Sequence, residues 1–155
     1  SVLFFKNHGP MSGGSIRHPH SQIIGLRNYD YHEDITVKNM NGWLLHEDQD
    51  IRITLSKHPI IGFFEYNLRF KPDVPVRSIA MRLQQTIRYV LDSLAKFSQS
   101  YNYFFYQLED GYEYIKVIPR YITTPLYVGY KIPQTCNDQR AAKILHNITP
   151  YFELK

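Results

Sequence analysis

Hydrophobic and polar residues alternate along two stretches near the middle of the chain, and this pattern predicts β-strands with one buried face. Every second side chain is apolar in Ile51–Leu55, and residues 64–70 place Phe64, Tyr66, Leu68 and Phe70 on one face. A preceding strand is expected at residues 43–46, after the turn-forming dipeptide Asn41-Gly42. Three successive antiparallel strands are the simplest interpretation.

Further strands are expected on both sides of this meander. Val2–Lys6 is an apolar run typical of a buried strand. Residues 101–108 and 112–121 predict a hairpin, with the dipeptide Asp110-Gly111 at its turn. Between Val2–Lys6 and the meander, Arg27–Asn41 is rich in polar residues and indicates a linker.

Helical periodicity appears twice. The segment Ser78–Ser98 carries an apolar stripe at helical spacing, which predicts a long helix packed on the sheet: Ile79, Leu83, Ile87, Val90, Leu91 and Leu94. A last helix is expected over Gln139–Asn147, capped by Asn137 or Asp138. The order β-β-β-α-β-β predicts an α+β fold with helices on one face of an antiparallel sheet.

The composition is typical of a globular protein, and the chain has a single cysteine. The chain has 155 residues, of which 43% are hydrophobic and 21% charged, so it can form a substantial core. Cys136 is the only cysteine, which excludes an intrachain disulfide and fits a reducing compartment. No apolar run reaches membrane-spanning length, and we expect a cytoplasmic protein.

A net charge of +4 suits an anionic ligand such as a nucleotide. The basic residues are dispersed, so we expect neither nucleic-acid nor membrane binding.

The segment that carries chemistry lies near the start of the chain. His18, His20 and Gln22 are spaced every second residue, and on a strand they would project from one side. They follow a glycine-serine loop that contains Gly13 and Gly14, whose backbone N–H groups are suited to an anion. Two imidazoles and an amide beside such a loop favour phosphorus chemistry.

Imidazole titrates near neutral pH, so an unprotonated ring nitrogen is available as a nucleophile. Covalent capture by that nitrogen would divide one displacement into two easier ones. Backbone N–H groups and the Gln22 amide would stabilise charge on the phosphoryl oxygens. The simpler alternative is that His-Pro-His occurs by chance on a surface strand. We interpret the other histidines as scattered polar residues without a shared site: His8, His32, His46, His58 and His146.

The combination of Asn7–Gly9, Ser12–Ser15 and His18–Gln22 resembles the active-site signature of the galactose-1-phosphate uridylyltransferase branch of the histidine triad superfamily. The resemblance implies that His20 attacks the α-phosphorus of a nucleotide and is transiently nucleotidylated. It implies contacts of Gln22 with the phosphoryl oxygens and phosphate-side roles for Ser15 and Asn7.

The resemblance also gives His18 two alternative roles. In one, it orients His20 by hydrogen bonding. In the other, it is a structural zinc ligand, which needs four ligands and therefore residues upstream of this chain.

Two later segments depart from the family. Tyr112-Glu113-Tyr114 stands where many members have His-x-His, which binds a second metal in some of them, so we expect this second metal site to be absent. Residues 126–131 resemble the segment that crosses to the partner subunit and holds the sugar, which implies a homodimer with Tyr130 and Lys131 as substrate-binding residues. Lys131 replaces an acidic residue that accepts sugar hydroxyls, so that contact is lost, and a more anionic acceptor is an alternative to galactose 1-phosphate.

The resemblance further implies that the chain begins inside a larger, two-half protein. Residues 1–28 would form the end of a first histidine-triad half, 29–41 a linker and 42–155 a second half. The resulting hypothesis is a nucleotidyltransferase that takes a nucleotide-sugar or similar nucleotide and a phosphorylated acceptor. A phosphorylase or hydrolase of the same superfamily and a non-catalytic nucleotide-binding or dimerisation module remain as alternatives.

Overall fold

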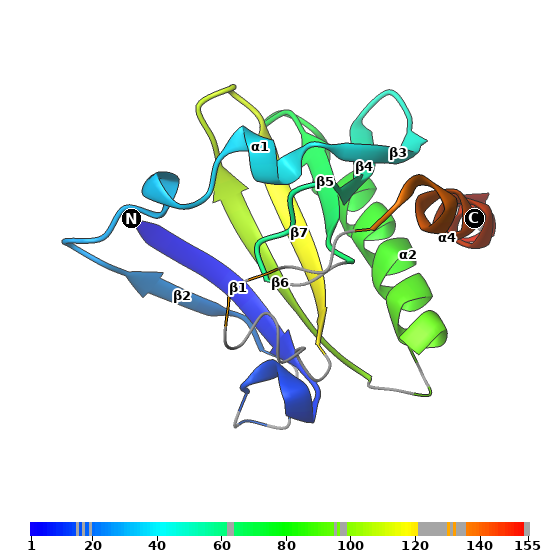
Figure 1. Ribbon diagram of the computed structural model, residues 1–155. Coiled ribbons are helices and arrows are strands. Elements are labelled where there is room, and N and C mark those ends of the chain that lie inside the picture. The colour runs from blue at the N-terminus through cyan, green and yellow to red at the C-terminus, as the bar shows by residue number, and fades with distance from the viewer. Residues whose placement is uncertain are drawn as a thin grey trace.

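A computed structural model describes most of the chain (Figure 1). The described residues are 1–14, 16, 18, 20–61, 64–94, 96, 99–120, 130, 132 and 136–153. Within them the structure combines one antiparallel sheet with α-helices, which confirms the expected α+β class. None of the helices in these ranges is long and apolar enough to cross a membrane.

The described part of the chain forms a seven-stranded sheet in the order β2-β1-β6-β7-β5-β4-β3, with every neighbouring pair antiparallel. The strands are β1 (Val2–His8), β2 (Gln22–Gly25), β3 (Gly42–Glu47), β4 (Ile51–Ser56), β5 (Tyr66–Phe70), β6 (Ser100–Gln107) and β7 (Glu113–Arg120). Because β1 pairs with β6, the motif-bearing first segment and the later strands share one sheet.

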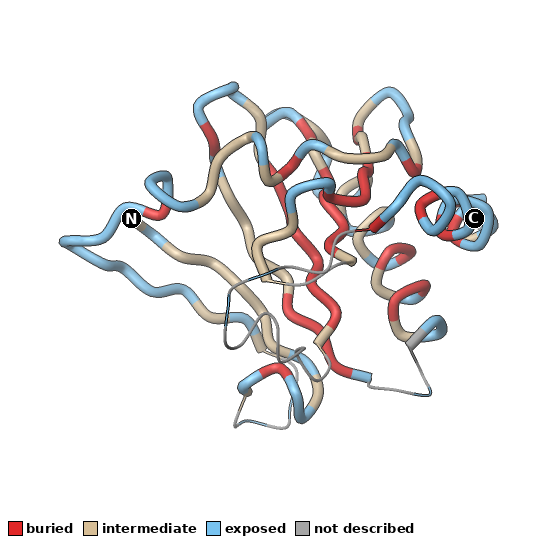
Figure 2. The backbone as a smooth tube through the Cα atoms, in the orientation of Figure 1, coloured by how far each residue is buried: buried red, intermediate tan, exposed pale blue. Residues whose placement is uncertain are grey.

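One face of the sheet carries the main hydrophobic core. Alternate residues of the central strands are fully buried there, as period-2 alternation requires. They include Ile53, Leu55, Leu68, Ile115 and Val117. Figure 2 shows this burial concentrated in the central strands, with β2 exposed at the sheet edge.

Two helices cover this core face and contact each other (Figure 1). Helix α2 spans Val76–Leu94, starting two residues before the predicted Ser78, and its stripe residues Ile79, Leu83 and Val90 join the core. Helix α4 spans Asp138–Glu153 and passes the predicted end at Asn147. Burial of Ile148 and Phe152 stabilises this last stretch, although it contains Pro150.

The linker covers the opposite face of the sheet. It contains two short 3-10 or α-helical turns, η2 (Tyr31–Glu33) and α1 (Val37–Met40), so Asn41-Gly42 joins a helix to β3 and is not a hairpin turn. Tyr31 and Met40 form a second core cluster with Leu108 and Tyr114. The predicted turn of the later hairpin is confirmed, with Gly111 at φ 77°.

A fully buried ion pair lies on the same face of the sheet, beneath the linker. Lys116 Nζ is 3.0 Å from Glu65 Oε2, and both side chains have 0% exposure. Burial lowers the pKa of Lys116, and the Glu65 carboxylate opposes that shift. Lys116 also donates to the Asn39 carbonyl, while Glu65 accepts the backbone N–H groups of Ile60 and Ile61. The pair therefore connects the linker to the segment that precedes β5.

Candidate functional site

The glycine-serine loop leaves β1 through backbone that only glycine adopts readily. Gly9 has φ 79° and ψ 167°, and the short 3-10 helix η1 (Pro10–Ser12) follows it. The Ser12 hydroxyl donates to the Gly9 carbonyl over 2.7 Å, and the Met11 N–H donates to Ser100 Oγ over 3.1 Å. These contacts fix the loop against the start of β6.

The two imidazoles lie next to each other but not on a strand. Strand β2 begins only at Gln22, which pairs with Phe5, and His18 lies in a bend. The prediction that strand alternation aligns His18 and His20 is therefore wrong. A local hydrogen bond brings the groups together, because His20 Nδ1 is 2.9 Å from the His18 carbonyl oxygen. The ring centroids are 5.5 Å apart in an edge-on arrangement.

These contacts assign the tautomer of His20. A carbonyl oxygen only accepts, so Nδ1 carries the proton and donates to His18. In the neutral ring Nε2 then holds a lone pair. Gln22 Nε2 lies 3.3 Å from His20 Nε2, so the Gln22 amide donates to that lone pair. The site thus presents a nucleophilic ring nitrogen beside a side-chain amide, with His20 half-buried and His18 exposed.

A chain of hydrogen-bonded side chains runs from Arg120 at the end of β7, through Asn102 on β6, to Asn7 on β1. Arg120 Nη1 donates to Asn102 Oδ1 over 2.9 Å, and Asn102 Nδ2 donates to Asn7 Oδ1 over 2.5 Å. Asn102 Nδ2 also donates to the Ser12 carbonyl over 3.0 Å. Asn7 and Asn102 are register partners in β1 and β6, and Asn102 is only 2% exposed.

The direction of this chain follows from the guanidinium at its end. Arg120 can only donate, so the Asn102 atom facing it must be the oxygen. Asn102 therefore turns its NH2 group to Asn7 and Ser12, and the acceptor on Asn7 must be its oxygen. Asn7 is consequently held with its own NH2 group available as a donor.

The structure brings some of the predicted site residues together. Gly14 packs against Asn7, since a Cβ on Gly14 would lie 3.1 Å from Asn7 Cβ. Gly13 ends η1 at φ 80° in an exposed position. Asn7 and Gly14 are therefore in contact at the end of β1, and the two histidines follow later in the connection to β2.

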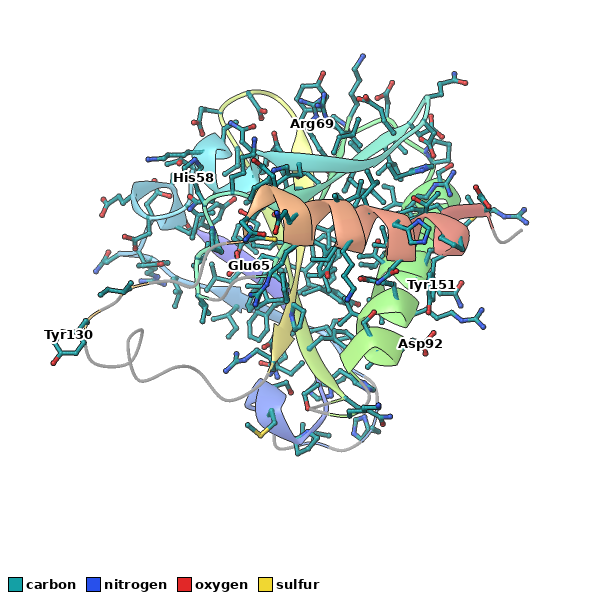
Figure 3. The ribbon with its side chains drawn as sticks, turned by 45° about the vertical axis from the view of Figure 1, so that its right-hand side comes forward. His58, Glu65, Arg69, Asp92, Tyr130 and Tyr151 are labelled. Atoms are coloured by element: carbon teal, nitrogen blue, oxygen red, sulfur yellow. The ribbon has the colours of Figure 1, made fainter. Side chains whose placement is uncertain are left out.

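The other residues predicted to bind substrate are either highly exposed or outside the described part of the chain. Tyr130 is 75% exposed and projects outward from the molecule (Figure 3). Ser15 and Lys131 lie outside the described residues.

The described residues contain no group of three or more His, Cys, Asp or Glu side chains that could hold a metal ion. The zinc role of His18 requires ligands from elsewhere and stays a prediction. Two of the scattered histidines have acidic partners, because His32 contacts Asp30 and His46 contacts Asp48.

Asn102 and Arg120 were not identified from the sequence. Asn102 lies 95 residues from Asn7 and meets it only through the pairing of β1 with β6. The one local signal is an amide among aromatic residues in a strand, at a position that proves to be buried.

Comparisons with known proteins place both parts of the chain in one family. The model described as the DUF4931 N-terminal domain matches residues 1–29, and that of the DUF4931 C-terminal domain, of unknown function, matches residues 32–152. A crystal structure of a DUF4931 family protein from Bacillus cereus ATCC 10987 is similar, at 39% identity and a TM-score of 0.83. The match covers 99% of this chain and 70% of that one. No curated protein gave a significant match.

Proposed function

We propose that this chain, which belongs to the DUF4931 family, is a nucleotidyltransferase that works through a covalent nucleotidyl-histidine intermediate on His20. The observation that carries the proposal is the hydrogen bonding of His20, with Nδ1 bound to the His18 carbonyl and Nε2 facing the Gln22 amide. This is the tautomer that a nucleophilic Nε2 needs. The resemblance of the motif to the galactose-1-phosphate uridylyltransferase branch, together with the β-β-β-α-β-β order, supports a histidine-triad-like fold.

In the first step His20 Nε2 uses its lone pair to form a bond with the α-phosphorus of a nucleotide-sugar. The bond from that phosphorus to the bridging oxygen breaks, and the sugar phosphate leaves with the electron pair. The ring becomes cationic, and the Nδ1 proton stays on its hydrogen bond to the His18 carbonyl. His18 thereby acts as a positioning residue through its backbone.

In the second step an oxygen of a phosphorylated acceptor attacks the same phosphorus. The phosphorus–Nε2 bond breaks, its electron pair returns to the ring, and His20 is regenerated. Each step exchanges one phosphorus bond for another, so no oxidant, reductant or extra proton donor is required.

Charge on the non-bridging oxygens needs donors that are already in place. The groups suited to donate to these oxygens are the Gln22 amide, the Asn7 NH2 group and the backbone N–H groups around Gly13 and Gly14. The Gln22 amide would move its donor from His20 Nε2 to a phosphoryl oxygen when substrate binds. Asn7 keeps its NH2 group near Gly14 because Asn102 occupies its oxygen.

An exchange experiment tests this function. The protein is incubated with UDP-glucose and radiolabelled glucose 1-phosphate, and label is measured in UDP-glucose. Double displacement predicts label exchange without a second nucleotide, abolished in His20→Asn. Release of UMP, or of UDP when inorganic phosphate is added, would instead identify the hydrolase or phosphorylase of the same superfamily. Tight binding of UDP-glucose and ATP with no exchange and no product would show a non-catalytic binding module.

A further inference from the structure

Arg52 and Arg69 lie directly opposite each other on neighbouring strands. Their Cα atoms are register partners in the pairing of β4 with β5, so both side chains leave the sheet on the same face. That face is the one opposite α2, because the adjacent register pair, Ile53 and Leu68, enters the core. Like charges directly opposite one another destabilise a sheet, so folding alone gives no reason for this pair.

Neighbouring groups orient the two guanidinium groups but only partly neutralise them. The Arg69 guanidinium stacks over the Tyr112 ring, 4.3 Å from its centroid. Arg52 Nη1 lies 3.5 Å from Glu47 Oε1, in an ion pair whose side chains are 40% and 46% exposed. Such an exposed pair contributes little. Both arginines also line another pocket, which includes the acidic residues Glu47, Asp48, Asp50 and Asp73.

The arginine pair borders a pocket of about 300 Å³. Its wall also includes Asn41, Gly42, Thr54 and Lys57, so three cationic residues meet there. None of the described residues that line this pocket carries a carboxylate. A hollow with excess positive charge and two planar guanidinium groups matches a tetrahedral anion, whose oxygens accept paired N–H donors.

We infer that this pocket is a second anion site, which binds the phosphate group of a small molecule between Arg52 and Arg69. It is separate from the His20 site. Arg69 pairs with Tyr114 near the start of β7, whereas Arg120 ends that strand six residues later, about 20 Å away. Figure 3 shows Arg69 at the opposite end of the molecule from the η1 loop. The second site therefore does not depend on the proposed nucleotidyl transfer.

The test is a titration followed by two-dimensional NMR of the backbone amides, which resolves the two sites in one experiment. Inorganic phosphate and glucose 1-phosphate are added separately at constant ionic strength, with chloride as the reference anion. We expect saturable shifts at Asn41 and Gly42 with at least one of the two phosphates. Tighter binding of glucose 1-phosphate would identify a phosphate ester as the ligand, and equal affinity would identify free phosphate.

Two substitutions make the assignment specific. Arg52→Gln and Arg69→Gln should each weaken the affinity reported by Asn41 and Gly42 at least tenfold, while responses at Gly13 and Gly14 stay unchanged. The exposed Arg77 on α2 provides the matched control, and Arg77→Gln should bind as the unmodified chain does. The inference is overturned if Asn41 and Gly42 do not respond up to tens of millimolar phosphate. It is equally overturned if their response survives in both arginine variants, and either variant suffices if the other fails to fold.

Discussion

Arg120 donates to Asn102 Oδ1 over 2.9 Å, and this contact sets the direction of the amide chain that ends at Asn7. The cationic donor also polarises that chain, because successive hydrogen bonds reinforce one another in a buried setting. A residue on β7 thereby controls which end of the Asn7 amide faces the glycine loop. Arg120 is a positioning residue in the proposed reaction.

Replacing Arg120 tests this relationship. Arg120→Met removes the donor, so the Asn102 amide can reverse and release Asn7. Loss of a charge-assisted hydrogen bond costs about 1.5–3 kcal/mol, and a loss of this size in transition-state stabilisation corresponds to a roughly 10- to 150-fold slower nucleotidylation of His20. Arg120→Gln keeps a neutral donor and should lie between this variant and the unmodified chain. The rates are measured in single turnover, with thermal unfolding as a check on the fold.

If Arg120 had a purely structural role, both substitutions would lower thermal stability. The fraction of each variant that remains folded would then nucleotidylate His20 at the rate of the unmodified chain. Equal single-turnover rates for Arg120→Met and the unmodified chain would contradict the positioning role. Arg77→Gln serves again as the control for removal of one positive charge.

Gly9 is required by the backbone at the start of the loop. Its φ of 79° is a conformation that L-residues rarely adopt, and a Cβ there would lie 2.4 Å from Ser100 Oγ. Gly9→Ala should therefore lower the free energy of unfolding by about 1–3 kcal/mol and slow adduct formation on His20. Urea unfolding measures the first effect, and intact mass measures the second.

Gly111→Ala provides the comparison, since Gly111 also has a positive φ but has open space around its Cβ position. It should destabilise the fold less and leave His20 reactivity unchanged. Equal losses of stability in the two variants would show that the loop tolerates a side chain at position 9.

The buried ion pair of Lys116 with Glu65 gives a stability prediction. Lys116→Met leaves the Glu65 carboxylate buried without its cation, and breaking a buried pair in this way costs roughly 3–5 kcal/mol. The free energy of unfolding in urea should fall by that amount. The exposed Lys71 is the control, and Lys71→Met should change stability by no more than about 0.5 kcal/mol. A loss below about 1 kcal/mol for Lys116→Met would mean that the pair is not held as described.

Asp48 links stability to acid pH. Burial alone would raise the pKa of the Asp48 carboxyl. The backbone N–H groups of Ile51 and Asp50, with His46 and Arg82, outweigh burial and lower that pKa to about 2, from an ordinary value of 3.8. A group whose pKa is depressed on folding stabilises the fold above its unfolded pKa. We therefore expect this contribution to be complete above about pH 4 and lost as pH falls towards 2.

Unfolding measured at pH 5 and at pH 2.5 tests the role of Asp48. The difference in free energy of unfolding between these two pH values should be smaller in Asp48→Asn than in the unmodified chain. The exposed Asp73 serves as the control, and Asp73→Asn should keep the full difference. An unchanged difference in Asp48→Asn would place the acid sensitivity elsewhere.

The elements of the fold could be predicted from the sequence because burial imposes a period on the side chains. Alternation located β4 and β5, and the apolar stripe located α2. The predicted end of α4 at Asn147 is too early, because Ile148 and Phe152 continue the buried face past Pro150. Tertiary packing outweighs that local signal.

Only the site residues that lie close together in the sequence could be predicted from it. His18, His20 and Gln22 lie within five residues, so their chemistry could be predicted, although a bend rather than a strand brings the rings together. Arg120 and Asn102 act through strand pairing over a long sequence separation, which no local pattern encodes.

Intact-protein mass spectrometry after incubation with UDP-glucose or ATP is the decisive measurement for covalent catalysis by His20. We expect a covalent adduct of one nucleoside monophosphate, mapped by peptide fragmentation to His20. The adduct should be lost on addition of a phosphorylated acceptor and should not form in His20→Asn, whereas His58→Asn should still form it. Absence of an adduct with every nucleotide tested, or an adduct that persists in His20→Asn, would contradict a nucleotidyl-histidine mechanism.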